Sequence, residues 1–123
     1  AAAEEVHAAW TDDAKLAATV VLPWTTLTGA QALATYAGEI TTHTWDLAKA
    51  TGQHVDWDDE LCDVALGEIT RELPVADRTP MWEAFRAENP YAGDFPPPFA
   101  NAVPVPDDAS PIDQLVAWSG RQP

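Results

Sequence analysis

The sequence of 123 residues predicts a mainly α-helical protein with a short β element near residues 19–24. Several proline-free segments are bounded by residues typical of helix ends, which indicates helices. The β-branched run TVVL at 19–22 indicates the β element, and Pro23 restricts it to an edge or an extended segment. Apolar residues make up 46% of the chain, enough for one core, so we expect a single domain over 1–123.

The longest predicted helix lies between Thr28, a good N-cap residue, and Gly52, a good residue to follow a helix. At 1.5 Å per residue, a helix of this length would extend about 34 Å. We treat residues 25–28 before it as a loop. Gly38, at its middle, costs roughly 1 kcal/mol relative to alanine, which indicates that another element approaches the backbone closely. The expected buried face runs through Leu33, Tyr36, Ala37, Ile40, Thr44 and Leu47.

Shorter helices are predicted on both sides of this one. They cover 1–10, a segment from 56 or 58 to 73, the segment 79–88 and a terminal helix at 110–120. Thr79 and Ser110 each precede a proline, and a capping residue followed by proline is a typical helix start. Thr11, Asp12 and Asp13 are capping residues for a short turn that reaches residue 18.

Residues 89–108 form a proline-rich segment, which we expect to be extended chain. Its aromatic residues Tyr91, Phe95 and Phe99 favour a strap packed across the domain. The run FPPPF within it is also typical of a ligand for an SH3-like partner, which is the alternative interpretation.

The charge and the cysteine content exclude several classes of function. Twenty acidic and six basic residues give a net charge of −14, which repels phosphate backbones and anionic lipids. We therefore expect no nucleic-acid partner and no membrane partner. Cys62 is the single cysteine, so an intrachain disulfide cannot form. A cytoplasmic location is the natural expectation, although a cysteine-poor exported protein would have the same composition.

Glu39 and His43 are the candidate metal ligands. They stand four residues apart on the longest predicted helix, so their side chains share one face and could hold one ion, most naturally zinc. Asp46, one turn beyond His43, could accept the second imidazole N–H and so fix the tautomer. The ordinary alternative is a Glu–His hydrogen bond on a half-exposed flank, since a catalytic zinc normally has three protein ligands.

The remaining candidates have simpler interpretations. His7 and His54 are expected on the surface, and Cys62 is expected as a small core residue. Trp24 and Trp45 either pack in the core, which we favour, or line a cleft above the metal.

The string HTWDLAKATGQ at 43–53, with Glu39 four residues before its histidine, resembles a signature of the DinB-like, mycothiol-dependent maleylpyruvate isomerase family. It is most similar to a branch of small metal-binding proteins in that family. The segments HAAWTDDAKL, VLPWTTLTGAQAL and PVPDDASPIDQLVAWSGRQP extend the resemblance over most of the chain, and residues 74–100 match loosely.

This resemblance implies an up-down four-helix bundle, of which this chain would be the C-terminal portion, without the N-terminal helices. It implies a divalent metal held by Glu39, by His43 and by a histidine from an early helix that no residue here matches. It also implies that a metal-bound thiol, mycothiol or a similar one, serves in a transferase or isomerase reaction on a small anionic molecule. Arg121 would bind the carboxylate of that molecule, because a guanidinium pairs with a carboxylate through two parallel hydrogen bonds. A charge that answers the dipole of the terminal helix is the alternative role of Arg121.

Two other hypotheses stay open at this point. The chain could be a non-catalytic bundle that binds a metal, a small ligand or a partner chain. Its exposed helix faces could also form a homodimer, because helices that lack their bundle neighbours have apolar surface to bury.

Overall fold

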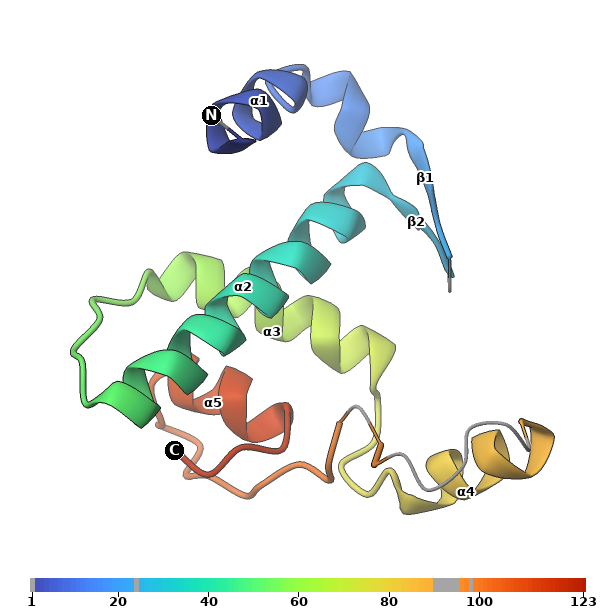
Figure 1. Cartoon of the computed structure of the whole chain (residues 1–123), viewed down its shortest axis with the longest axis vertical. Coiled ribbons are helices and arrows are strands. Elements are labelled where there is room, and N and C mark those ends of the chain that lie inside the picture. Colours follow the sequence, from blue (N-terminus) through green and yellow to red (C-terminus); the bar gives the residue numbers. More distant parts are fainter. Residues whose placement is uncertain (1, 24, 90–95, 98) are drawn as a thin grey trace.

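The structure is a computed structural model that describes residues 2–23, 25–89, 96, 97 and 99–123 (Figure 1). It is mainly helical with one short β element, as the sequence predicts. Its elements in chain order are the helix α1 (Ala2–Ala9), the short 3-10 helix η1 (Asp13–Ala17), the strands β1 (Thr19–Leu22) and β2 (Thr25–Thr28), and the helices α2 (Gly29–Thr51), α3 (Asp59–Glu72), α4 (Thr79–Glu88) and α5 (Pro111–Trp118).

The β element is an antiparallel hairpin of β1 and β2, in which Thr19 pairs with Thr28 and Leu22 pairs with Thr25. The prediction of a strand near 19–24 is confirmed for β1, but the expectation of a loop at 25–28 is wrong. Three of the four residues in Thr-Thr-Leu-Thr are β-branched threonines, and the one apolar residue, Leu27, lies on the buried side. Both features are usual signals of a strand.

The ends of α2 are where the sequence places them. The Thr28 hydroxyl accepts a hydrogen bond from the Gln31 backbone N–H, and Gln31 Oε1 accepts one from the Thr28 N–H at 2.9 Å. This reciprocal pair satisfies two N–H groups that have no partner inside the helix. Gly52 ends the helix with φ of 67°, in the left-handed region that glycine enters without a steric cost.

The expected buried face of α2 is wrong. Tyr36, Ile40 and Leu47 are 50%, 68% and 62% exposed. The fully buried residues of α2 are instead small ones, and Trp45 is partly buried against the core; the small ones are Gly29, Ala32, Thr41, Thr42 and Ala48. A Cβ built on Gly38 would lie 3.5 Å from the Ala65 Cβ, so α3 is the element that comes close to the glycine backbone. Small side chains let two helices approach each other, and Tyr36, Ile40 and Leu47 are left on the opposite side, the outward face of α2.

The core lies between α2, α3 and α5. It is built from Cys62 and Ala65 of α3 and from Ile112, Leu115 and Val116 of α5. Figure 1 shows α5 lying beside α3 on one side of the α2–α3 pair. Asp58 caps α3 by accepting from the Leu61 N–H at 3.0 Å, and Ser110 accepts from the Asp113 N–H at 3.3 Å at the start of α5, as expected from the sequence.

The part of the strap that the structure describes is tied to the rest of the molecule. The Val103 N–H donates to the Ala117 carbonyl at 2.9 Å, and the Trp82 indole N–H donates to the Phe99 carbonyl at 3.0 Å. These bonds support an intrachain strap at 99–103. Tyr91 and Phe95, the other two aromatic residues of the predicted strap, lie outside the described residues.

Arg78 joins three segments, a role that the sequence does not reveal. It is fully buried, and its guanidinium donates to the carbonyls of Ala100 and Trp118 and lies 5.4 Å from the Trp118 ring. Arg78 also occupies the N-cap position of α4. The sequence predicts Thr79 as the cap, but Thr79 is the first residue of the helix, so α4 begins one residue earlier than expected.

The outer helices make few contacts. All residues of α1 are exposed, and Figure 1 shows α4 projecting away from α2, α3 and α5. Within the described ranges, none of the helices combines the length and the apolar character that a membrane span needs.

Candidate functional site

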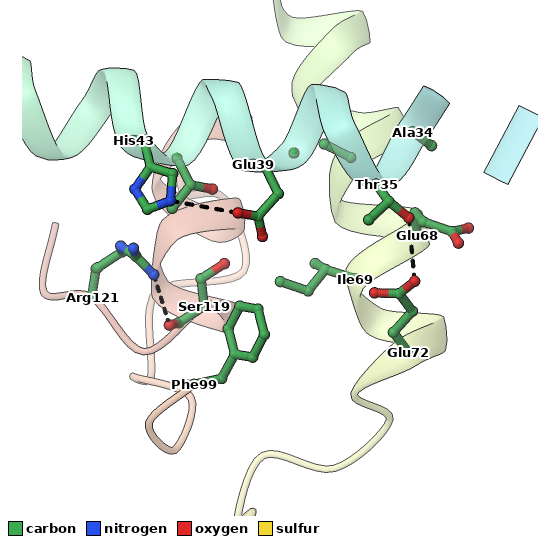
Figure 2. Close-up of a pocket in the computed structure, with 13 residues that line it drawn as sticks. Ala34, Thr35, Glu39, His43, Glu68, Ile69, Glu72, Phe99, Ser119 and Arg121 are labelled. Carbon is green, nitrogen blue, oxygen red and sulfur yellow. Dashed lines mark hydrogen bonds and ion pairs between the residues drawn. The ribbon is translucent and has the colours of Figure 1, made fainter. Parts of the chain in front are cut away.

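A cavity of about 320 Å³ lies between α2, α3 and the C-terminal segment. It contains both predicted metal ligands and the predicted arginine, so the structure brings together all three predicted site residues (Figure 2). Ile69 and Phe99 form part of its apolar wall. The other lining residues are Ala34, Thr35, Gly38, Glu39, Thr42, His43, Ala65, Glu68, Glu72, Ser119 and Arg121.

Glu39 and His43 face each other on the rim of the cavity. His43 Nε2 lies 3.5 Å from Glu39 Oε2, and the two side chains are 68% and 50% exposed. Figure 2 shows both pointing from α2 toward the segment that carries Arg121. Two atoms that each lie roughly 2.1 Å from one tetrahedral zinc are about 3.4 Å apart, so this pair has the spacing of two zinc ligands.

Asp46 holds the other side of the His43 ring. His43 Nδ1 lies 3.3 Å from Asp46 Oδ2. With its proton on Nδ1, the imidazole would donate to this carboxylate, and the Nε2 lone pair would be available to a metal. The distance fits the predicted contact between Asp46 and the imidazole, and the effect of Asp46 on the tautomer stays a prediction.

Arg121 is paired with the same aspartate. Its Nε and Nη2 donate to the two Asp46 oxygens at 2.9 and 2.8 Å, and its Nη1 donates to the Ser119 carbonyl at 3.2 Å. The hydrogen bond from Arg121 lowers the pKa of Asp46, and the same bond raises the pKa of Arg121. Both groups therefore stay charged at neutral pH, and the C-terminal segment is fixed to α2.

The far end of the cavity is acidic, a feature that sequence reasoning missed. Glu68 of α3 is 8% exposed and forms an ion pair with Arg71, and the Thr35 hydroxyl donates to Glu72 at 3.2 Å. Glu68 and Glu72 are i, i+4 neighbours in the sequence, but only the packing of α3 on α2 shows that they face the same cavity as Glu39.

The residues present fit half of a zinc site. A carboxylate and an imidazole are suitable donors, and the four carboxylates of Glu39, Asp46, Glu68 and Glu72 outnumber the two guanidinium groups beside them, which favours a cation. Nevertheless, the described part of the chain holds no group of three His, Cys, Asp or Glu side chains placed to share a metal ion. A complete site therefore needs a ligand from elsewhere.

The other candidate residues lie apart from the cavity. His7 is exposed on α1, and His54 Nε2 lies 3.1 Å from Asp56 on an exposed loop. Cys62 is buried in the core, as expected, and burial raises the pKa of its thiol. Trp45 packs against the core with Lys49 over its ring, whereas Trp24 lies outside the described residues.

Comparison with known proteins extends over almost the whole chain. No family model matches it, and no solved structure matches it. Two proteins of Mycobacterium tuberculosis, the uncharacterized protein MT0763 of strain CDC 1551 / Oshkosh and the uncharacterized protein Rv0738 of strain ATCC 25618 / H37Rv, are each 33% identical over 121 residues. The match covers 98% of this chain and 58% of each relative, so the chain spans well under two thirds of the length of these relatives.

Proposed function

We propose that Glu39 and His43 bind a divalent metal, zinc first among the candidates, and that the cavity beside them serves a thiol-dependent transferase or isomerase of the DinB-like, mycothiol-dependent type. The observation that carries this proposal is the 3.5 Å approach of His43 Nε2 to Glu39 Oε2 on the rim of the cavity. The excess of carboxylates around the cavity supports a cation at this place.

The chemistry of such a site follows from the ion. A bound divalent metal lowers the pKa of a coordinated thiol and so raises the fraction of reactive thiolate. Mycothiol or a similar thiol is the co-substrate that the resemblance implies. A thiol of this kind stays reduced in the cytoplasm, where we expect the protein to act.

Arg121 is the residue we propose to bind the carboxylate of a small anionic substrate. Three of the five N–H groups of its guanidinium donate to Asp46 and Ser119. One N–H on each terminal nitrogen has no acceptor within the described ranges and is available to a ligand. The pairing with Asp46 would hold the guanidinium in place for that contact.

Metal content and zinc affinity test the metal part of the proposal. We expect the purified chain to bind zinc in isothermal titration calorimetry, with a loss of affinity of at least about tenfold in Glu39→Gln and His43→Gln. His54→Gln is the matched control, since His54 also stands beside a carboxylate but outside the cavity. Equal affinity in all of these proteins would contradict the proposal.

Substrate binding is tested separately by Arg121→Lys, which keeps the charge but loses the planar fork. With zinc bound, we expect a raised KM for a small unsaturated carboxylate in a thiol-dependent assay and an unchanged zinc affinity. An unchanged KM would remove Arg121 from the substrate site.

A non-catalytic metal- or ligand-binding protein is the second candidate. The Asp46–Arg121 ion pair favours it, because the guanidinium edge best suited to a carboxylate is used inside the protein. Zinc binding without thiol-dependent turnover of any unsaturated carboxylate would select this candidate.

A further inference from the structure

The starting observation is the wall of the cavity that lies across from α2. Figure 2 shows Phe99, Ser119 and Arg121 on this side. These residues come from two segments, the strap and the end of the chain, and all three lie outside the helices and strands. Side chains on irregular segments keep a fixed place only where other contacts hold the backbone. Contacts outside the cavity must therefore hold these two segments together.

Arg78 provides such a contact. Its Nη1 donates to the carbonyl of Ala100, which follows Phe99 in the strap. Its Nη2 donates at 2.7 Å to the carbonyl of Trp118, which precedes Ser119. A planar guanidinium presents its donors in fixed directions, so it sets the separation of the two carbonyls that it joins.

Two further contacts lie at the same junction. A Cβ built on Gly120 would come within 2.8 Å of the Ala100 Cβ, so the end of the chain packs closely on the strap. The backbone N–H of Arg78 donates at 2.7 Å to the side chain of Asn101. The strap is therefore held to Arg78 by both its backbone and a side chain.

The chemistry of Arg78 distinguishes it from an ordinary core residue. It is fully buried, and this burial lowers its pKa. In the part of the chain that the structure describes, no carboxylate pairs with it, and its Nε has no hydrogen-bond partner. A buried charge without an opposite charge costs stability, and an apolar side chain of similar volume often costs less. Its two carbonyl contacts, rather than stability alone, account for an arginine at this place.

We propose that Arg78 is a positioning residue of the cavity, which fixes the strap to the end of the chain and thereby places Phe99 and Arg121 in the wall that a ligand meets. The proposal rests on the proposed function, because the cavity has this wall only for a ligand that occupies it.

The hydrogen bonds beyond Arg78 show which part of the site depends on it. The carbonyl of Ser119, next to Trp118, accepts from Arg121 at 3.2 Å. Arg121 in turn donates to Asp46 at 2.9 and 2.8 Å. A displaced Trp118 would therefore move the guanidinium of Arg121, while both metal ligands, which α2 carries, would keep their places. Loss of Arg78 should weaken the binding of a carboxylate more than the binding of zinc.

Amide hydrogen exchange of the full chain tests the structural step. Arg78→Met keeps the length of the side chain and removes its donors. The N–H groups of Val103 and Arg121 donate to carbonyls of α5 at 2.9 Å, and we expect them to exchange at least about tenfold faster in this variant. The amides of α3 should keep their parent rates. Cys62→Ala is the matched control, since it removes a buried group of α3 and should accelerate the α3 amides instead.

Calorimetric titration tests the step to the site, first with zinc and then with crotonate, a small unsaturated carboxylate. We expect the affinity for crotonate to fall at least about tenfold in Arg78→Met, as for a misplaced binding group, and the affinity for zinc to stay close to that of the parent. Arg78→Lys keeps the charge without the planar fork and should fall between the two. If the methionine variant does not fold, the same measurements on the lysine variant decide.

The outcomes separate the role of Arg78 from the proposed function. Exchange that accelerates equally in the strap and in α3 would make Arg78 a core residue only and would overturn the proposal. Selective exchange with unchanged affinity for crotonate would also overturn it. A parent chain that binds crotonate but no zinc would contradict the proposed metal site and leave the crotonate comparison as the test of Arg78. A parent chain that binds no crotonate would overturn both.

Discussion

The apolar side of α5 and the outward face of α2 have similar sequence patterns but different surroundings. Ile112, Leu115 and Val116 of α5 are 6%, 0% and 0% exposed, because α3 covers them. Ile40 and Leu47 of α2 remain 68% and 62% exposed. The comparison teaches that apolar periodicity identifies the apolar side of a helix but not the element that covers it. In α2, a side of small residues packs on α3 instead.

The largest expected difference between these two faces is in the cost of truncation. We expect Leu115→Ala to reduce the free energy of unfolding by about 2–5 kcal/mol, since it opens a cavity in the core. Ile40→Ala should change the free energy of unfolding of the monomer by less than about 0.5 kcal/mol. Urea unfolding followed by circular dichroism at low protein concentration measures both. A large cost at Ile40 in the monomer would mean that its face is covered within one chain.

Protein concentration sharpens the same comparison. If α2 pairs with a second copy, then the effect of Ile40→Ala should grow as the concentration rises, because dimerisation stabilises only the folded state. The effect of Leu115→Ala should stay nearly constant.

A second test asks whether the N-terminal residues cover the start of α2. A Cβ on Gly29 would lie 2.0 Å from the Lys15 carbonyl oxygen, so Gly29→Ala should cost on the order of 2 kcal/mol or detach residues 2–18 from α2. Amide hydrogen exchange of Gly29, whose N–H donates to Ala18 at 2.9 Å, distinguishes the two results. Unchanged stability and protection would contradict this packing.

The Asp46–Arg121 ion pair fixes the C-terminal segment to the covered side of the site, and its effect should depend on pH. The pKa of Asp46 is below its usual 3.8 because Arg121 donates to it. Its contribution to stability is therefore complete above the unfolded pKa and is lost as the pH falls through the folded value.

The variant Asp46→Asn measures this pH-dependent contribution to stability. We expect it to be less stable than the parent at neutral pH by up to about 1 kcal/mol, as for a partly exposed pair. The difference should shrink below pH 3.8, because Asp46 is protonated first in the unfolded chain and then, at lower pH, in the folded protein. Denaturant unfolding across this range is the measurement, and a difference that grows in acid would contradict the assigned role.

The smallest expected effects come from two helix-interior glycines. Gly67 of α3 has open space around a built Cβ, whereas Gly38 faces Ala65 at 3.5 Å. Gly67→Ala should stabilise the protein by up to about 1 kcal/mol, the propensity difference, and Gly38→Ala by the same amount or less. Thermal unfolding of both variants ranks them. A loss of stability at Gly67 would indicate that another surface covers that side of α3.

The sequence predicts the local features well. Thr28 and Gly52 bound α2, Ser110 caps α5, and Glu39, His43 and Asp46 lie on one side of their helix, since each of these depends on residues within one or two turns. The strand at 25–28 carries a local signal that the loop interpretation overlooked. The acidic wall of Glu68 and Glu72 has no such signal, because it exists only where α3 packs on α2.

By itself, the sequence determined where the helices begin and end, the net charge of −14, and the common side of Glu39 and His43, because capping and helical spacing act over a few residues. Tertiary structure alone decided that α2 turns small residues toward α3 and exposes Ile40. It also decided that Arg121 reaches Asp46, 75 positions away in the chain. Burial and ion pairing of this kind depend on contacts between distant segments, and helical periodicity carries no information about them.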